Sequence, residues 1–396
     1  MTTAYFDHAA TTPLRSEALD AMLPFLRSDF ANPSSPHSSG QRVRAALDDA
    51  REKTAAAVGA KPSEIVFTGS GSEADCQAIF GIMDAHRKRG NHFITSSIEH
   101  HAVLHAAEAL RARGARVTVL PVDGAGIVGL DALRAALADD TVLVSIMHAN
   151  NEIGTLQPIA ELAALAHERG ALVHSDAVQT IGHIEVNVKQ LGLDALSLSG
   201  HKFEGPKGIG ALYLRKGVAC TPLIFGGSQE FGRRAGTENV AGIVGLATAL
   251  QLAVREIDDT APAISKLRDR LIDGLLAAIP GSALNGSRAQ RLPNNANLRF
   301  DDIEGQTVVI ALDQAGFETS TGSACTSGSL APSHVLSAIG LDPLRARGSI
   351  RFSLGRSTAQ DSVERLLLCM PGIIERLRRL SGVLVAQTPA AAGGTG

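Results

Sequence analysis

Ser197-Leu198-Ser199-Gly200-His201-Lys202 is the stretch of this 396-residue chain that indicates both its fold and its chemistry. The apolar run that leads into it, residues 194–199, predicts a short strand, and Gly200 predicts a turn that leaves Lys202 at the strand's end. An amine held at such a place suits a Schiff base with a carbonyl cofactor. A surface lysine beside a turn would look the same, so the hexapeptide alone leaves both interpretations open.

Helix and strand patterns alternate on both sides of this stretch, from about residue 40 to 255. Amphipathic periodicity predicts helices over residues 41–58, 72–89, 101–113, 130–138 and 158–169. Short apolar runs between them predict strands over residues 65–68, 92–95, 116–120, 143–147, 172–175 and 195–199. The alternation predicts an α/β fold whose mostly parallel sheet carries helices on both faces. Ligands of such sheets bind beyond the carboxyl ends of the strands.

The pattern changes after about residue 256. Helices are predicted at 264–279, 305–315 and 358–380, with strands at 296–300 and 350–353. We therefore expect a large domain over residues 14–255 and a smaller α+β domain formed by residues 1–13 and 256–385. Residues 388–396 are only Ala, Gly, Thr and Pro, for which we expect disorder.

The composition is that of an ordinary globular protein, with 44% hydrophobic and 19% charged residues. A net charge of −3 gives no electrostatic reason to expect nucleic acid or an anionic membrane as a partner. The first residues do not form a secretory signal, and Thr248 and Gln251 interrupt the longest apolar segment, residues 240–254. We expect a cytoplasmic protein. No two of the four cysteines have CxxC spacing, which argues against a structural zinc site.

Other polar residues also follow predicted strands, where a cofactor would bind. If the carbonyl cofactor contains a pyridine ring, Asp176 would pair with the protonated nitrogen of that ring. An acid at a strand end also serves as a helix cap. Gln179 would reach a ring hydroxyl. Gly71 and Ser72 open a predicted helix after a glycine-rich turn, where free backbone N–H groups favour a phosphate. Any strand-to-helix loop resembles this turn, so the turn is weak evidence by itself.

Four further candidates complete this site. Ser199 and His201 lie beside Lys202 and would add phosphate donors. His100 follows a strand and would stack over a ring and act as an acid or base, although a chain with 13 histidines makes one such placement unremarkable. Asn151 would hydrogen-bond either the ring hydroxyl or the substrate.

A single cysteine, Cys325, lies within Gly322-Ser323-Ala324-Cys325-Thr326-Ser327-Gly328, among small residues only. Such a segment has few side chains to pack, so we expect it to move easily. A mobile thiol suits a nucleophile that must travel, whereas an incidental cysteine in a structural loop is the weaker interpretation. With Lys202, it indicates an enzyme that binds pyridoxal phosphate and moves sulfur.

Several further motifs follow one another along the chain. They are Asp7-His8-Ala9-Ala10-Thr11-Thr12-Pro13, Asn32-Pro33-Ser34-Ser35, Glu99-His100, Asn150-Asn151-Glu152-Ile153-Gly154, Asp176-Ala177-Val178-Gln179, Ser199-Gly200-His201-Lys202, Gly232-Arg233-Arg234-Ala235-Gly236-Thr237-Glu238-Asn239, the Cys325 segment and Ile350-Arg351-Phe352-Ser353-Leu354-Gly355-Arg356. With these motifs in this order, the chain resembles the cysteine desulfurases over about residues 4 to 380, in the branch that serves iron–sulfur clusters and nitrogen fixation.

The resemblance implies an aspartate-aminotransferase-like fold, pyridoxal phosphate as cofactor, and a homodimer. It implies that Lys202 forms the Schiff base, that His100 stacks on the ring, and that Thr237 reaches the phosphate of the other subunit. Phosphate ligands within the subunit would be Gly71, Ser72, Ser199 and His201, and the ring would be bound by Asp176 and Gln179. Asn151 and Arg351 would hold the substrate carboxylate.

The resemblance also implies the reaction. L-cysteine would become L-alanine, with its sulfur left on Cys325 as a persulfide and passed to an iron–sulfur scaffold or another acceptor protein. His100 and the substrate amine are both candidates to deprotonate Cys325. We expect no resident metal, with Cys325 considered only as a transient ligand of an iron–sulfur cluster.

Three positions depart from the family pattern, and two rival functions remain. Ser72 stands where threonine is usual, which keeps the hydroxyl. Cys76 stands where a polar residue is usual, and Ser228 where a histidine is frequent. A C–S lyase or selenocysteine lyase would need no persulfide, which Cys325 argues against. A catalytically silent scaffold subunit would not need Lys202, Asp176 and Cys325 together.

Overall fold

The computed structural model describes residues 3–322 and 333–380. The segment that contains Cys325 and the tail predicted to be disordered, residues 388–396, therefore lie outside the described residues.

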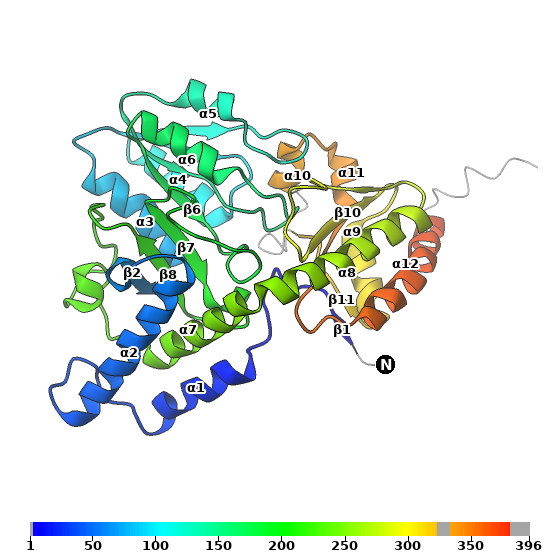
Figure 1. Cartoon of the computed structure of the whole chain (residues 1–396). Helices are drawn as coiled ribbons and strands as arrows, with labels where there is room; N and C mark the ends of the chain where they lie inside the picture. The colour runs from blue at the N-terminus through cyan, green and yellow to red at the C-terminus, as the bar shows by residue number, and fades with distance from the viewer. Residues whose placement is uncertain (1–2, 323–332, 381–396) are drawn as a thin grey trace, which may run out of the picture.

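A seven-stranded sheet forms the centre of the larger half of the molecule (Figure 1). Its order is β2-β8-β7-β6-β5-β3-β4, and the pairs from β7 to β4 are all parallel. The strands are, in sheet order, Ile65–Thr68, Gly210–Leu214, Ala195–Ser199, Leu172–Asp176, Thr141–Ser145, His92–Ser96 and Arg116–Leu120. The predicted mostly parallel α/β sheet is confirmed. Strand β8 was not among the predicted strands; it pairs antiparallel with both β7 and β2.

Helices cover both faces of this sheet, as predicted. They are α1 (Ser16–Arg27), α2 (Ser38–Ala57), α3 (Gly71–Ala85), α4 (His101–Ala112), α5 (Leu130–Ala136), α6 (Ile159–Glu168) and α7 (Val240–Arg255), with single 3₁₀ turns at Pro62–Glu64, Gly200–Lys202 and Gln229–Gly232. Helices α1 and α7 were not predicted. Strand β5 begins two residues earlier than predicted, because Thr141 already pairs with His92 of β3.

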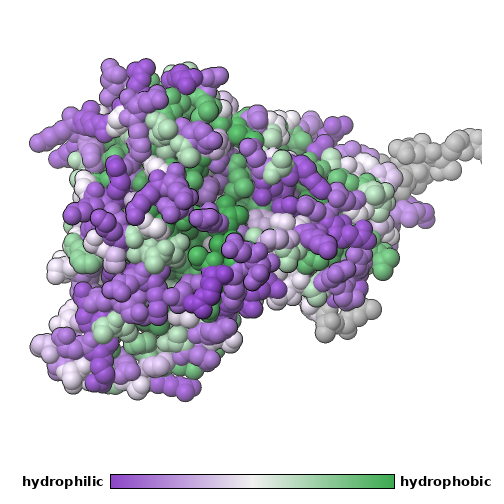
Figure 2. Space-filling view, viewed as in Figure 1, coloured by the Kyte–Doolittle hydropathy of each residue, from purple (hydrophilic) through white to green (hydrophobic). Residues whose placement is uncertain are grey.

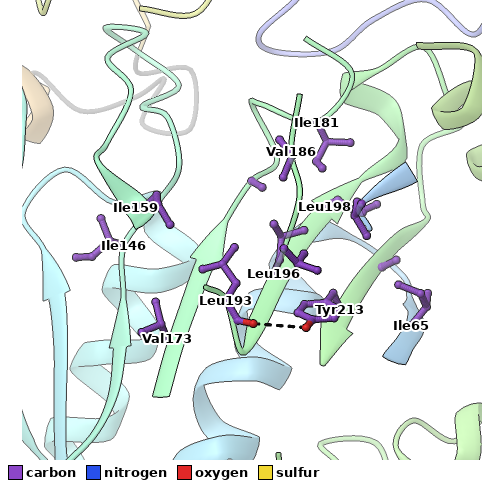
Figure 3. Close-up of a cluster of buried hydrophobic side chains, with 14 of the residues drawn as sticks. Ile65, Ile146, Ile159, Val173, Ile181, Val186, Leu193, Leu196, Leu198 and Tyr213 are labelled. Atoms are coloured by element: carbon purple, nitrogen blue, oxygen red, sulfur yellow. Dashed lines mark hydrogen bonds between the residues drawn. The ribbon is translucent and has the colours of Figure 1, made fainter. Parts of the chain in front are cut away.

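Side-chain alternation along the strands divides the core into two layers. Leu196 and Leu198 of β7 belong to a cluster that also holds residues of α2, α6 and α7, part of which Figure 3 shows. Ala195 of the same strand belongs to the layer under α3 and α4. Within the first cluster, the Tyr213 hydroxyl donates a hydrogen bond to the Leu193 carbonyl at 3.4 Å (Figure 3). Successive residues thus face opposite sides, as a covered parallel sheet requires.

The chain beyond α7 builds a second core with smaller sheets. Its helices are α8 (Ile257–Ala278), α9 (Gly305–Gln314), α10 (His334–Ala338), α11 (Pro343–Arg347) and α12 (Gln360–Leu380). Its strands are β9 (Ser282–Leu284), β10 (Asn295–Phe300), β11 (Phe317–Glu318) and β12 (Ser349–Ser353), joined by β1 (Ala4–Tyr5), which pairs in parallel with β11. Phe6 is fully buried in this core with Phe300 and Phe352.

Helices α7 and α8 connect the two halves, with α8 crossing to the second half (Figure 1). The view in Figure 2 shows hydrophobic residues gathered in the middle of this face, where the halves meet. In the described ranges no single helix is long and apolar enough to cross a membrane. The α7–α8 pair passes that test by length and composition only, and it is bent by 74°.

Candidate active site

The carboxyl ends of the parallel strands open onto a cavity of about 400 Å³. Strands β6 and β7, the first turns of α3 and α4, the N-terminal segment and β12 all contribute to its lining. The predicted site residues that line it are Gly71, Ser72, His100, Asn151, Asp176, Gln179, Ser199, His201, Lys202 and Arg351. Segments from both halves of the sequence therefore meet at one place, as the strand-end rule requires.

Lys202 ends the 3₁₀ turn that follows β7. Its Nζ donates hydrogen bonds to the carbonyls of Ala9 at 2.5 Å and Ala10 at 2.8 Å. Gly200 makes this turn possible, because a Cβ at that position would lie 2.9 Å from the Pro206 carbonyl oxygen. The N-terminal segment thus holds the amine inside the cavity.

The start of α3 provides an anion-binding end of the cavity. The Ser70 side chain caps the helix by accepting the Glu73 N–H at 3.1 Å, and the N–H groups of Gly71 and Ser72 lie in the first turn, where a helix offers no acceptor. A Cβ on Gly71 would lie 2.8 Å from Val178 Cγ2, so only glycine lets the helix approach β6 this closely. These free donors suit a phosphate.

Ser199, the last residue of β7, and His201, two residues later, also line the cavity. His201 Nδ1 lies 3.1 Å from Thr11 Oγ1. Burial, helped by the nearby Lys202, lowers the pKa of His201 to about 4. His201 is therefore neutral near pH 7 and acts as a hydrogen-bonding group rather than a charge.

Asp176 lies at the end of β6 and is 5% exposed. Its Oδ1 accepts the Val178 N–H at 2.9 Å. Burial raises the pKa of Asp176, while the neighbouring His100, the Val178 N–H and Lys202 oppose that rise. Gln179 donates from Nε2 to the Ala9 carbonyl at 3.1 Å, so it shares an acceptor with Lys202.

His100 caps helix α4, and this contact determines how the ring is protonated. Its Nδ1 accepts the Ala102 N–H at 3.1 Å. Burial lowers the pKa of His100, so the ring is neutral near pH 7. With Nδ1 occupied as an acceptor, the one ring hydrogen is on Nε2. His100 therefore offers a donor, not an acceptor, at its other nitrogen.

The opposite wall of the cavity is centred on Arg351 of β12, whose side chain is 3% exposed. Its Nη2 donates to Asp7 Oδ1 at 2.7 Å, and its Nη1 donates to the carbonyls of Asn151 at 3.0 Å and Gly322 at 3.4 Å. Its Nε is buried and has no hydrogen-bond partner among the described residues. A buried guanidinium with an unused donor suits a carboxylate ligand.

Two described residues flank the segment that contains Cys325. Gly322 lines the cavity. At the other end, Ser333 caps α10 by accepting the Val335 N–H and donates to Glu152 Oε2 at 2.5 Å. The placement of Cys325 itself lies outside the described residues.

Thr237 does not line this cavity. It is exposed and lines a separate hollow of about 210 Å³ with Gly69 and Arg234. Arg234 Nε donates to Glu73 Oε1 at 2.9 Å, which ties this turn to the start of α3. Within this chain, therefore, Thr237 lies behind the phosphate-type loop and not beside Lys202.

Of the three residues that depart from the family pattern, Ser72 lines the cavity, whereas Cys76 and Ser228 lie away from its lining. Cys76 is half-buried on α3, and burial raises the pKa of its thiol. Ser228 is exposed before the 3₁₀ turn Gln229–Gly232. In the described parts of the chain, no group of three or more His, Cys, Asp or Glu side chains could hold a metal ion.

Sequence reasoning missed one ionisable residue of the cavity, Asp75. It is 1% exposed on α3 and lines the cavity with Asp176. A signal was present: Asp75, Ala78, Ile79 and Ile82 recur at helical spacing, and all four are buried. An acid within an apolar helical stripe marks a buried carboxyl group that needs an explanation.

Comparison with known proteins gives concordant relatives. Residues 4–366 match the aminotransferase class-V family. The chain is 53% identical over 377 residues to "Cysteine desulfurase IscS" of Methanosarcina thermophila, covering 95% of this chain and 93% of that protein. It is 52% identical over 377 residues to the protein of the same name from Dictyoglomus turgidum, covering 95% and 96%. A solved structure described as "NifS-like protein" matches with a TM-score of 0.90 at 39% identity, covering 95% of this chain and all of that one.

Proposed function

The chain belongs to the cysteine desulfurases of the aminotransferase class-V family, and we propose that it removes sulfur from L-cysteine with pyridoxal phosphate bound in the cavity described above. One observation carries this proposal. A lysine, a buried aspartate, a helix N-terminus and a buried arginine, from segments far apart in the sequence, line the same cavity.

The residues present fit the cofactor. The N–H groups of Gly71 and Ser72, with Ser199 and His201, would hold its phosphate. Asp176 would pair with the ring nitrogen, and Gln179 would reach the ring hydroxyl from beside Ala9. When bound, the cofactor supplies an electron sink for the bonds around the substrate's Cα.

The chain's own residues would position the substrate and move its protons. Arg351 would hold the substrate carboxylate through the donor that is unused in the structure, with Asn151 beside it. Lys202 Nζ, once released from its bond to the cofactor, would take the proton from Cα. His100, which carries its hydrogen on Nε2, would serve as a donor, so the substrate amine is the better base for the Cys325 thiol.

Cys325 would accept the sulfur. Its thiolate attacks the sulfur of the substrate, the substrate's C–S bond breaks, and a proton at Cβ completes alanine, leaving Cys325 as a persulfide. In sequence Cys325 follows Gly322, which lines the cavity, by three residues, a length of chain that spans about 10 Å at most.

A homodimer, a sulfur acceptor and a cytoplasmic location belong to the same proposal. Thr237 would reach the phosphate of the second subunit, because in its own protomer it lies outside the cavity. Phe225 and Phe231, on the same connection as Thr237, are 79% and 57% exposed, which supports burial against a second copy. An iron–sulfur scaffold or another acceptor protein would take the persulfide sulfur.

The deciding experiment uses Cys325→Ser. The purified variant should be yellow like the parent, and borohydride reduction with peptide mapping should place a pyridoxyl group on Lys202 in both proteins. With L-cysteine and a reductant, the parent should release alanine, and the variant should form no persulfide and almost no alanine.

Two results would overturn the proposal. A pyridoxyl label on another residue, or none after incubation with pyridoxal phosphate, would contradict the cofactor site. Release of alanine and sulfide by Cys325→Ser at the parent rate would show a lyase that does not use this thiol.

A further inference from the structure

Asp75 is a buried carboxyl group for which the mechanism above has no use. It projects from α3, is 1% exposed, and lines the cavity together with Asp176. Its Oδ1 has no hydrogen-bond partner among the described residues. A carboxylate buried without partners is strongly destabilising, so this group is either paired in some other way or uncharged.

The one basic side chain in ion-pair range of Asp75 is His174, within the described residues, and it does not provide a charge. Asp75 Oδ1 and His174 Nε2 are 3.6 Å apart, beyond a hydrogen bond. Both nitrogens of His174 contact serine hydroxyls instead, Ser145 Oγ at 2.8 Å and Ser197 Oγ at 2.9 Å. Burial lowers the pKa of His174 to about 3, so its ring is neutral near pH 7.

The groups that face Asp75 from other elements are mostly carboxyl groups. A negative charge on Asp176 of β6 disfavours a charge on Asp75, and so does Glu99, which precedes α4, once it ionises near its own pKa of about 8. Only the Ser197 hydroxyl favours a charge on Asp75. On its own helix, Cys76 and Glu73 add no positive charge. Burial and these neighbours raise the pKa of Asp75 well above its usual range.

Of the two carboxyl groups, Asp176 has more contacts that stabilise its ionised form. It accepts the Val178 N–H, and its ionised form is favoured by His100 when that ring is protonated and by the positive charge of Lys202. Two adjacent carboxyl groups share one proton unequally, and the proton stays on the group with fewer stabilising contacts.

We propose that Asp75 is a positioning residue that stays protonated, so that Asp176 is the one described anion of the cavity that would face the ring nitrogen of the cofactor. The inference rests on the proposed function, since Asp176 is taken to pair with the ring nitrogen. If Asp75 were charged, two carboxylates, Asp75 and Asp176, would lie near a single protonated ring nitrogen. The neutral acid instead leaves one negative charge facing one positive charge.

Infrared spectroscopy of the cofactor-free protein tests the protonation directly. A carboxylic acid and a carboxylate absorb at different frequencies, so the parent-minus-Asp75→Asn difference at pH 7 should show the loss of one acid band. Glu99→Gln is the matched control: burial raises the pKa of Glu99 to about 8, so it contributes an acid band of its own, which Asp75→Asn should retain. Loss of a carboxylate band in place of an acid band would overturn the inference.

The visible absorbance of the holoprotein, titrated with pH, tests the action through Asp176. Asp75→Asn replaces one neutral group by another, so its titration midpoint should lie within about 0.3 pH units of the parent. Asp75→Leu removes the polar atoms of this one side chain from beside Asp176 and should move the midpoint by about one unit or more. A shift of that size in Asp75→Asn would show that Asp75 is charged, and an unshifted Asp75→Leu would show that it only fills space.

A failure of the proposed function and a failure of the inference about Asp75 would give different results. If the parent binds no pyridoxal phosphate, the proposed function fails while the infrared result on the cofactor-free protein still stands. If the parent binds it and the acid band is absent, only the role of Asp75 fails.

Discussion

The two walls of the cavity differ in how they are built. On the sheet wall, Asp176 and Lys202 end neighbouring parallel strands or the turn directly after one. On the opposite wall, Arg351 is held by Asp7 and by the carbonyls of Asn151 and Gly322, which come from three other parts of the chain. One wall follows from the regular geometry of a sheet, and the other depends on the docking of distant segments.

The two walls therefore suit different roles, one in the chemical step and the other in substrate binding. The sheet wall has rigid, buried groups that suit the cofactor and the movement of protons. The opposite wall has one buried cation with a free donor, which suits recognition of the substrate. Substitutions on the first wall should therefore act on the chemical step, and substitutions on the second on substrate binding.

The largest effect should come from the sheet wall, at Lys202. Lys202→Ala removes the amine that bonds the cofactor and takes the Cα proton, so kcat should fall by about 10³-fold or more. Assays of alanine formation, quenched at fixed times, measure this loss of kcat. Borohydride should no longer fix a pyridoxyl group to the protein. A Lys202→Ala protein with near-parental kcat would mean that the sheet wall does not perform the proton transfer.

Arg351 tests the opposite wall. Arg351→Ala removes a charge-assisted contact worth about 1.5–3 kcal/mol, so KM for L-cysteine should rise by roughly 10- to 150-fold. Steady-state kinetics should show a smaller change in kcat than in KM. Arg351→Lys keeps the charge but loses the planar fork, and should fall between the parent and the alanine variant.

The contrast between the walls would be lost if Arg351→Ala lowered kcat as strongly as Lys202→Ala while leaving KM unchanged. That result would place Arg351 in the chemical step.

His148 follows β5 at the same edge of the sheet but does not line the cavity, so it separates stability from chemistry. It is 7% exposed, and burial lowers its pKa to about 4. Because the folded pKa lies below the unfolded value, the unfolded state binds more protons between about pH 6.5 and 4. The stability from keeping His148 neutral is present above pH 6.5 and is lost as the pH falls, by about 2 kcal/mol from pH 7 to pH 5.

Denaturant unfolding of the parent and His148→Gln at both pH values measures this. The stability of the parent should drop by about 2 kcal/mol more than that of the variant over this interval. Equal drops would mean that folding does not lower the pKa of His148.

Cys76 should give the smallest effect. It directly follows Asp75 on α3 but does not line the cavity. Cys76→Ser should keep the parental kcat and KM and change the free energy of unfolding by less than about 1 kcal/mol. A large loss of activity would show that the sheet wall extends further along α3 than its lining residues indicate.

The sequence by itself determined the sheet wall. Apolar strand runs that end in polar residues place Asp176, Ser199 and Lys202 at one edge, since the carboxyl ends of parallel strands meet there. The periodicity of the helices placed Gly71 and His100 at helix starts, where the structure has them in the first turn of α3 and at the cap of α4. Local patterns suffice here because each residue's position follows from the element it belongs to.

Only the tertiary structure decided the opposite wall and the protonation states. Arg351 Nη2 lies 2.7 Å from Asp7 Oδ1 because the N-terminal segment docks beside β12. No local sequence pattern encodes that docking. The donor on His100 and the Asp75 Oδ1 that has no hydrogen-bond partner among the described residues depend likewise on contacts between elements. Burial and partners set the charge of a side chain, and both are properties of the folded chain rather than of its neighbours in sequence.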